Sequence, residues 1–331
     1  MTAQPQISVV VPSRNRSHLL TRLLRCLADQ RGVNAFEVIV VDDCSDDDTA
    51  HVLAQLADQS PFPLTAASTK RPAGAAAARN VGWRLATAPL VAFTDDDCRP
   101  EPLWLASLVS GFADAGVVQG ATSYSASEAA GRGPFSQVVS VEQWSGQFET
   151  SNVAYRRDVL ERLDGFDERF EGDSYGEDVD LGWRALEGGA RSTFADDAIV
   201  VHDVKRGTAL EEVAAAVRQA RRWRHIGRVL HEHPGYRPYR LYRGPFLFAT
   251  HPPTLLALAG LGVLAAGPRN RATRTLAICC VLPWLRHRTL VEPRGGRRRH
   301  WPAVLPAAFV VDAVETLTVV YSGARYRTLV L

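Results

Sequence analysis

Cysteine and lysine are scarce in this chain. Five cysteines are scattered through 331 residues with no CxxC pair, which argues against a zinc site and a disulfide framework and favours a reducing compartment. Lys70 and Lys205 are the only lysines, so arginine supplies nearly all of the positive charge. The sequence has no internal repeat and no low-complexity tract, and only the polar segment Met1–Gln6 precedes its first apolar run. We therefore expect a globular protein without a signal peptide, whose front half is cytosolic.

Charge of each sign is concentrated in a different part of the chain. Residues 1–205 contain 18 basic and 30 acidic side chains, a net charge of −12, whereas residues 206–331 contain 20 basic and 6 acidic ones, a net charge of +14. The total of +2 conceals this division. An acidic front part and a basic, apolar rear part are expected to have different roles.

The first hundred residues alternate between short apolar runs and amphipathic segments. Such alternation predicts an α/β fold, a Rossmann-like, mostly parallel sheet flanked by helices. Ligands of such sheets bind beyond the carboxyl ends of the strands, where Asp42-Asp43 and Asp95–Asp97 fall. The predicted strands are Ile7–Val11, Phe36–Val41 and Leu90–Thr94, and the predicted helices are Ser17–Gln30, Thr49–Ala57 and Ala75–Ala86.

From about Val117 the pattern becomes less regular, with short strands and loops. We expect helices at Arg157–Leu163 and Glu177–Glu187 and a strand at Ala198–Val201. A single long helix is predicted from about Thr208 to His231.

Two acidic clusters suggest chemistry. Three adjacent carboxylates at Asp95–Asp97 repel one another unless a cation lies among them, and Mg²⁺ binds through one or two carboxylates and substrate phosphates. An isolated cluster of this kind is more often a solvated loop, but the strand before it and the matching Asp42-Asp43 favour a cation site here. Glu177 and Asp178 open a helix, where acidic residues also stabilise the helix dipole, but a carboxylate there with a raised pKa is suited to accept a proton from a hydroxyl. His202 offers an imidazole ligand, although a single histidine is more often structural.

Seven segments follow one another along the chain: ISVVVPSRNR, VIVVDDCSDDDT, GAAAARNVGW, LVAFTDDDC, ETSNVAYRRDVLERLDGFDE, GEDVDLGWR and VVHDV. In this order they resemble the family 2 glycosyltransferases with the GT-A fold. The resemblance covers roughly residues 5–205 and implies a catalytic domain at 1–205, with a nucleotide-sugar half at about 1–115 and an acceptor half at about 116–205. The remainder, 206–331, is expected to be a helical, basic, membrane-associated region.

The resemblance implies a role for each matching residue. Asp97 is implied as the direct ligand of Mg²⁺ or Mn²⁺, and His202 as a second metal ligand that lies later in the sequence. Asp178 is implied as the catalytic base and Glu177 as its neighbour. The remaining matches are implied to bind the donor. They are Pro12 and Arg14 of the first nucleotide-binding loop, Asp43 at the donor's nucleotide base, Arg79 behind the nucleotide, Asp95 and Asp96 near the ribose, and Asn152 near the donor sugar or phosphate.

The predicted helix after Thr208 carries a further motif. Gln219, Arg222 and Trp223 match the QxxRW signature of the membrane-bound, processive branch of the family, in which these residues lie near the acceptor end of the active site. An apolar stripe beside many arginines is also typical of helices in a membrane interface. A solvated basic helix with a chance match is the alternative.

Three apolar stretches follow, at Pro245–Gly267, Leu276–Leu285 and Trp301–Ser322. The first is long enough to cross a bilayer of about 30 Å, and the third contains Asp312 and Glu315, which are costly at mid-bilayer. Flanking arginines, including Arg294–His300, suit an anionic leaflet. We expect contact with a membrane rather than a helical cap, and favour spanning by Pro245–Gly267.

Together these features predict an inverting, metal-dependent glycosyltransferase at the cytoplasmic face of the membrane. Its expected partners are a nucleotide-diphospho-sugar donor and a glycan or lipid-linked acceptor of the cell envelope, with no nucleic acid. The alternatives are an inactive nucleotide-sugar-binding subunit of a membrane assembly and a sugar-phosphate nucleotidyltransferase. The latter class uses a Gly-rich phosphate loop, which Pro12–Asn15 does not provide.

Overall fold

The computed structural model describes residues 4–129, 133–136, 138–170, 175–205, 207–268, 270–291 and 301–331. The chain divides into two compact units. We call Met1–Ala129 with Val138–Val204 the sheet unit, and Ala130–Gln137 with Lys205–Leu331 the helical unit.

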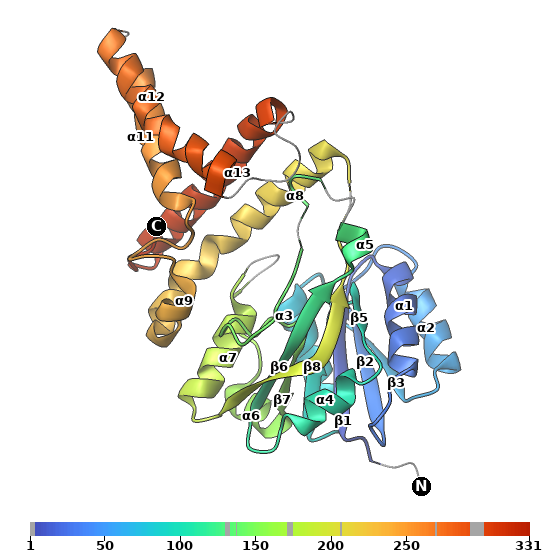
Figure 1. Ribbon diagram of the computed structural model, residues 1–331. Helices are drawn as coiled ribbons and strands as arrows, with labels where there is room; N and C mark the ends of the chain where they lie inside the picture. The colour runs from blue at the N-terminus through green and yellow to red at the C-terminus, as the bar shows by residue number, and fades with distance from the viewer. Residues whose placement is uncertain are drawn as a thin grey trace. The chain divides into compact units, whose positions relative to one another are not determined.

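The sheet unit is built on one eight-stranded mixed sheet with the order β3-β2-β1-β4-β7-β6-β8-β5 (Figure 1). Neighbours β3, β2, β1 and β4 are parallel, whereas β7 runs antiparallel to β4 and β6. This confirms the predicted α/β class with a mostly parallel, helix-flanked sheet. The strands are β1 (Ile7–Ser13), β2 (Phe36–Asp42), β3 (Leu64–Ser68), β4 (Leu90–Phe93), β5 (Cys98–Pro100), β6 (Val117–Tyr124), β7 (Val153–Arg156) and β8 (Ser192–His202).

Helices cover both faces of this sheet because successive side chains of its strands are buried on opposite sides. Val9 of β1 packs in a cluster with Leu23 of α1 and Trp104 of α4, while the next residue, Val10, faces α3. A Cβ atom on Gly82 of α3 would lie 2.4 Å from Cγ1 of Val10, so only glycine permits this close approach. The helices of the unit are α1 (Ser17–Ala28), α2 (Thr49–Gln59), α3 (Ala75–Leu85), α4 (Trp104–Ser110), α5 (Ala126–Ala129), α6 (Arg157–Leu163) and α7 (Glu177–Glu187).

The helical unit contains the rest of the chain. The single helix predicted from Thr208 to His231 is wrong in detail, because a 3-10 turn at Trp223–His225 separates two helices. Ala216, Ala257, Trp284 and Val311 from four helices form a common core. The helices are α8 (Ala209–Arg222), α9 (Ile226–Glu232), α10 (Arg237–Arg240), α11 (His251–Ala266), α12 (Arg271–Arg286) and α13 (Trp301–Arg325), with shorter turns at Pro234–Tyr236 and His287–Val291.

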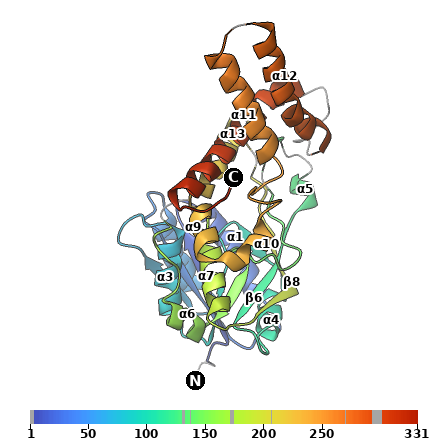
Figure 2. The same ribbon diagram turned by 90° about the vertical axis from the view of Figure 1, so that its left-hand side faces the viewer.

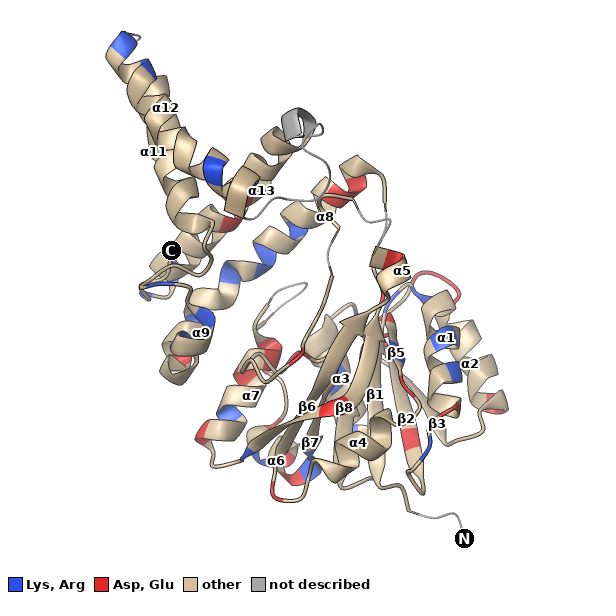
Figure 3. Cartoon of the chain, in the orientation of Figure 1, with Lys and Arg blue, Asp and Glu red and all other residues tan. Residues whose placement is uncertain are grey.

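Helices α11 and α12 form an antiparallel hairpin within the helical unit (Figure 2). Small residues allow the pair to approach closely, since a Cβ atom on Gly260 would lie 2.4 Å from Cβ of Cys280. Figure 3 shows Lys and Arg along α8 and at the free end of the hairpin. The segment Pro245–Gly267, predicted to span, contains a helix of only 16 residues. Only Val304–Arg325 within α13 is long and apolar enough to cross a membrane among the helices that the structure describes.

Candidate functional site

The carboxyl ends of β1, β2 and β4 meet at one edge of the sheet unit. β1 pairs in parallel with both neighbours, so Ser13 lies beside Asp42 and close to the segment that follows Phe93. The Oγ of Ser13 donates to Oδ2 of Asp96 at 2.7 Å. The edge therefore brings the two predicted acidic clusters to one side of the unit.

Arg16 is a site residue that the motif match missed. Its Nη1 lies 2.8 Å from Oδ1 of Asp96 and 3.3 Å from Oδ2 of Asp97. Burial raises the pKa of Asp96, and the charge of Arg16 partly opposes this shift. Arg14, the arginine named from the motif, is exposed and makes no hydrogen bond to another residue that the structure describes. The signal was present, because PSRNR contains both arginines in the loop after the first strand.

Asp97 and His202 form a pair that is suited to a cation. Nε2 of His202 lies 3.3 Å from Oδ1 of the buried Asp97. Nδ1 of His202 lies 2.9 Å from the backbone oxygen of Asp203, and since a carbonyl only accepts, neutral His202 carries its proton on Nδ1. Its Nε2 lone pair then faces a carboxylate oxygen, and a metal ion relieves this repulsion.

The donor set fits Mn²⁺ or Mg²⁺ with a phosphate-bearing ligand. One carboxylate oxygen and one imidazole nitrogen leave coordination positions for substrate oxygens. Cys98 lies within reach of both groups. Burial and the charges of Asp95 and Asp97 raise the pKa of its thiol well above the ordinary value, so Cys98 is a neutral thiol in the metal-free protein.

Arg79 connects the two acidic clusters. It is 4% exposed, and its guanidinium donates to Oδ1 of Asp95 at 2.9 Å and to Oε1 of Glu177 at 3.2 Å. Burial opposes the charge of Arg79, but the two carboxylates outweigh burial and its pKa is raised. Arg79 thus holds Asp95 and the start of α7 at one place in the sheet unit.

Asp178 lies in the first turn of α7, which follows Gly176. Gly176 has φ of 127°, a backbone conformation that favours glycine. The only hydrogen bond of the Asp178 side chain to a described residue comes from its neighbour, with Val179 N donating to Oδ1 at 2.8 Å. Desolvation, followed by the charges of Glu177 and Glu149, raises the pKa of Asp178 well above its usual range. A carboxyl in this state is suited to accept a proton near neutral pH.

Glu149 was not selected from the sequence, because its only signal is its place three residues before Asn152 in ETSN. Nε2 of Gln119 donates to Oε2 of Glu149. Glu149 therefore belongs to the acidic surroundings of Asp178, and only the folded chain reveals this.

Asp43 and Pro12 line the same edge of the sheet. The carboxylate of Asp43 accepts from Thr69 Oγ1 at 2.8 Å, from Ala73 N at 2.8 Å and from Gly74 N at 2.9 Å. It therefore fixes the loop before α3, the helix that carries Arg79. Pro12 is the half-buried penultimate residue of β1.

The side chain of Asn152 makes its hydrogen bonds inside the sheet unit. Its amide nitrogen donates to the backbone oxygens of Ala121 and Ala198, both at 2.7 Å, and its Oδ1 accepts from Trp104 Nε1 at 2.8 Å. Because all of its polar atoms are bonded inside the protein, we assign Asn152 a structural role and leave it out of the proposed donor site.

The QxxRW match lies in the helical unit, on the last turn of α8 and the 3-10 turn that follows. Nη1 of Arg222 donates to Oε1 of Gln219 at 3.0 Å. Trp223 is buried, with its ring 5.2 Å from that of Phe248, and the guanidinium of Arg240 lies 4.6 Å above it. These contacts explain the motif within its own unit, and its acceptor role remains a prediction. The flanking run Arg294–His300, which the sequence singles out, lies outside the described residues.

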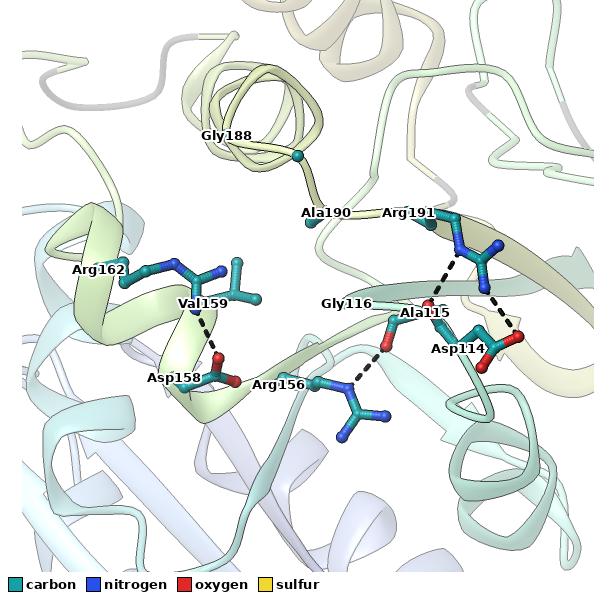
Figure 4. A pocket seen from close by; sticks show the side chains of 11 residues that line it. Asp114, Ala115, Gly116, Arg156, Asp158, Val159, Arg162, Gly188, Ala190 and Arg191 are labelled. Atoms are coloured by element: carbon teal, nitrogen blue, oxygen red, sulfur yellow. Dashed lines mark hydrogen bonds and ion pairs between the residues drawn. The ribbon is translucent and has the colours of Figure 1, made fainter.

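A separate depression of about 370 Å³ lies elsewhere in the sheet unit (Figure 4). Arg156 on its wall pairs with Leu90, the first residue of β4, whereas the acidic edge follows the last. Its Arg191 and Arg162 are neutralised by Asp114 and Asp158. Arg156 donates instead to the backbone oxygens of Ala115 and Phe112. This depression is thus distinct from the acidic edge, and its charged side chains are used in contacts within the sheet unit.

Comparison with known proteins identifies the class. The profile of "Glycosyl transferase family 2" matches residues 8–163, and that of "Glycosyl transferase family group 2" matches residues 90–286. The chain belongs to the family 2 glycosyltransferases, which confirms the resemblance seen in the sequence.

Two relatives illustrate this membership. The chain is 34% identical over 215 residues to the pre-mycofactocin glycosyltransferase of Mycobacterium tuberculosis, which covers 60% of this chain and 42% of that protein. It is 30% identical over 210 residues to glycosyltransferase AglE of Haloferax volcanii, a match that covers 61% of this chain and 68% of that protein. The chain therefore spans less than half of the length of the first relative.

Solved structures share the GT-A-type fold. The mannosyltransferase PcManGT from Pyrobaculum calidifontis, in complex with GDP-Man and Mn²⁺, superposes with a TM-score of 0.59 at 22% identity over 96% of this chain and 88% of that one. TarS 1-349 of S. aureus in complex with UDP-GlcNAc superposes with a TM-score of 0.53 at 19% identity over 98% and 92%. The predicted GT-A architecture is confirmed.

Proposed function

We propose that this chain is an inverting, metal-dependent glycosyltransferase that moves a sugar from a nucleotide-diphospho-sugar to an acceptor hydroxyl. The observation that carries the proposal is the bridge of Arg79, which links the Asp95–Asp97 segment to the start of α7, where Glu177 precedes Asp178. One cluster is suited to a metal and the other to a base, which a single displacement requires. The complexes of the structural neighbours with GDP-Man and UDP-GlcNAc support a nucleotide-sugar donor.

In the proposed reaction, the acceptor oxygen attacks the anomeric carbon while the bond from that carbon to the diphosphate breaks, and Asp178 takes the acceptor proton. The raised pKa of Asp178 favours this proton transfer. Asp97 and His202 would hold the divalent cation, which when bound neutralises charge on the leaving diphosphate. Arg79 keeps Asp95 and Glu177 in place. The remaining donor residues proposed are Pro12, Arg14, Arg16, Asp43 and Asp96.

We further propose that the protein works at the cytoplasmic face of the membrane on a glycan or lipid-linked acceptor of the cell envelope. The +14 charge of residues 206–331 supports electrostatic attraction to anionic lipid. Gln219, Arg222 and Trp223 are proposed to contribute to the acceptor end.

The test is release of nucleoside diphosphate from UDP-, GDP- and dTDP-sugars with Mn²⁺ or Mg²⁺ and with EDTA, after a thermal-shift screen for the preferred donor. The proposal predicts metal-dependent release of nucleoside diphosphate. Metal-dependent donor binding without any release would identify an inactive binding subunit instead. Pyrophosphate formed from a nucleoside triphosphate and a sugar phosphate would identify a nucleotidyltransferase.

A further inference from the structure

The helix that best satisfies the length and hydropathy criteria for membrane spanning, α13, is a core helix of the helical unit. Asp312 at its middle is completely buried. Nε of Arg288 donates to Asp312 Oδ2 at 2.7 Å, and Nε1 of Trp284 donates to the same oxygen at 2.9 Å. A salt bridge from the turn that follows α12 and a hydrogen bond from Trp284 fix one side of α13 within its own unit. On the same helix, Val310, Leu317 and Tyr321 stay more than half exposed.

The apolar face of α8 is also covered. Ala216 is buried in the core with Val311 of α13, and Val213 and Val217 pack against the same cluster. The interfacial role predicted for the basic helix after Thr208 therefore lacks an available apolar face.

The α11–α12 hairpin also exposes apolar side chains that no described residue covers. Its exposed large side chains are between 39% and 61% accessible, and the small residues around them are largely exposed as well. Isolated exposed leucines are ordinary, but six on two adjacent helices form a surface that suits an apolar partner. These six are Leu256, Leu261, Val263, Leu276, Ile278 and Leu282.

The charged residues of the hairpin itself are all of one sign. Residues 251–291 contain no Asp or Glu. Arg271 and Arg274 lie at the free end of the hairpin and Arg286 at its base, and none of the three forms an ion pair with a residue that the structure describes. Apolar surface bordered by free arginines is complementary to anionic lipid head groups above acyl chains.

A cavity of about 380 Å³ at the base of the hairpin is likewise apolar and bordered by arginine. Phe246, Pro252 and Val291 give it apolar walls, while Arg243 and Arg286 bring positive charge to its rim. It is suited to the head group and first methylenes of an anionic lipid.

We propose that the α11–α12 hairpin lies in the plane of an anionic phospholipid bilayer, at the level of the head groups, and is the membrane-docking surface of this chain. A 16-residue helix is about 24 Å long, shorter than the roughly 30 Å hydrocarbon core. Spanning would also bury Arg271 and Arg274, whereas a flat orientation lets Arg271, Arg274 and Arg286 all reach phosphates. The inference rests on the membrane association proposed above and specifies its surface.

The test is flotation of the full chain with vesicles of phosphatidylcholine alone and of phosphatidylcholine mixed with phosphatidylglycerol. The double variant Leu276→Gln/Ile278→Gln is expected to bind the mixed vesicles at least about tenfold more weakly. The matched control Leu103→Gln/Leu210→Gln changes two leucines outside the hairpin that are more than half exposed, and it is expected to bind like wild type. Arg271→Gln/Arg274→Gln is expected to weaken binding similarly at low salt, and Arg218→Gln/Arg221→Gln on α8 much less.

A second measurement uses the exposed Cys279 of α12 and the half-buried Cys44 of the sheet unit. Mixed vesicles are expected to slow modification of Cys279 by a water-soluble maleimide roughly fivefold or more, with Cys44 unaffected. If the hairpin variants bind vesicles like wild type and Cys279 is not protected, the hairpin is not the docking surface, although membrane association still holds. Failure of the wild type to bind any vesicle would overturn both, and protection of Cys279 that depends on protein concentration without lipid would identify a dimer. Metal-dependent nucleotide release tests the glycosyltransferase assignment separately.

Discussion

The variant Asp178→Asn is expected to lose transfer and gain stability. Asparagine has the shape of aspartate but accepts no proton, so transfer should fall by roughly two to four orders of magnitude. Donor affinity should remain close to wild type, because the proposed donor contacts are made by other residues. An ordinary destabilising substitution lowers activity and stability together, so the opposite signs make this prediction specific.

The gain in stability follows from the raised pKa of Asp178, caused by desolvation and then by Glu177 and Glu149. Between the unfolded pKa of about 3.9 and the higher folded one, the folded chain binds more protons than the unfolded chain. Stability is therefore lost as pH rises through this range, and near neutrality the wild type retains the cost of the half-buried charge of Asp178. Each unit by which the pKa is raised corresponds to about 1.4 kcal/mol. One such unit corresponds to a rise in Tm of roughly 3–5 °C for the asparagine variant.

The assay is thermal unfolding in EDTA across pH 3–8, together with product formation under saturating donor. The variant should match wild type below about pH 4 and exceed it increasingly at higher pH. Asp180→Asn is the matched control on the same helix. Asp180 is buried and lies 2.7 Å from Nη2 of Arg184, so this variant should be less stable. A lower Tm for Asp178→Asn at pH 7, or lost donor binding with retained turnover at saturation, would refute the reasoning.

Three further substitutions test other parts of the chain. Asp97→Asn should lose donor binding as well as turnover, and EDTA should do the same to wild type; normal donor affinity in metal-free protein would contradict the proposed metal role. Arg79→Met leaves Asp95 and Glu177 without their cation, so it should lower the free energy of unfolding of the sheet unit by about 3–5 kcal/mol in denaturant unfolding. Adding Glu177→Gln should restore part of this lost stability. Asp312→Leu should destabilise the helical unit by about as much, and adding Arg288→Met should restore most of it; an unaffected single variant would show that this pair does not hold α13.

The parallel half of the sheet was predictable from the sequence because its strands are buried on both faces. Ile7–Val11 and Phe36–Val41 are continuous apolar runs, and the observed strands extend them by only one or two residues. Helices α6 and α7 begin and end where they were predicted. By contrast, β3 is a half-exposed edge strand of Leu, Thr, Ala and Ser, which has no apolar run to reveal it.

The site was predictable in its acidic residues and not in their partners. Asp95, Asp97 and Asp178 stand out as clusters in the sequence, whereas Arg16 meets Asp96 across 80 positions and Gln119 meets Glu149 across 30. Spacing along the chain contains no information about such pairs. Asn152 shows the converse, since its motif position suggested a ligand contact that its hydrogen bonds inside the sheet do not leave available.

Charge compensation separates the structural carboxylates of this chain from those proposed for chemistry. Asp312 interrupts an apolar helix and is fully neutralised by Arg288 on a neighbouring segment, so it stabilises packing and leaves nothing for a ligand. Asp178 is half-buried, and Arg79, the cation whose charge acts on it, is bonded to Asp95 and Glu177 instead. A folded chain maintains an uncompensated carboxylate only at a cost in stability. That cost is what the pH-dependent gain of Asp178→Asn measures, so the same substitution tests both the proposed base and the reason for its reactivity.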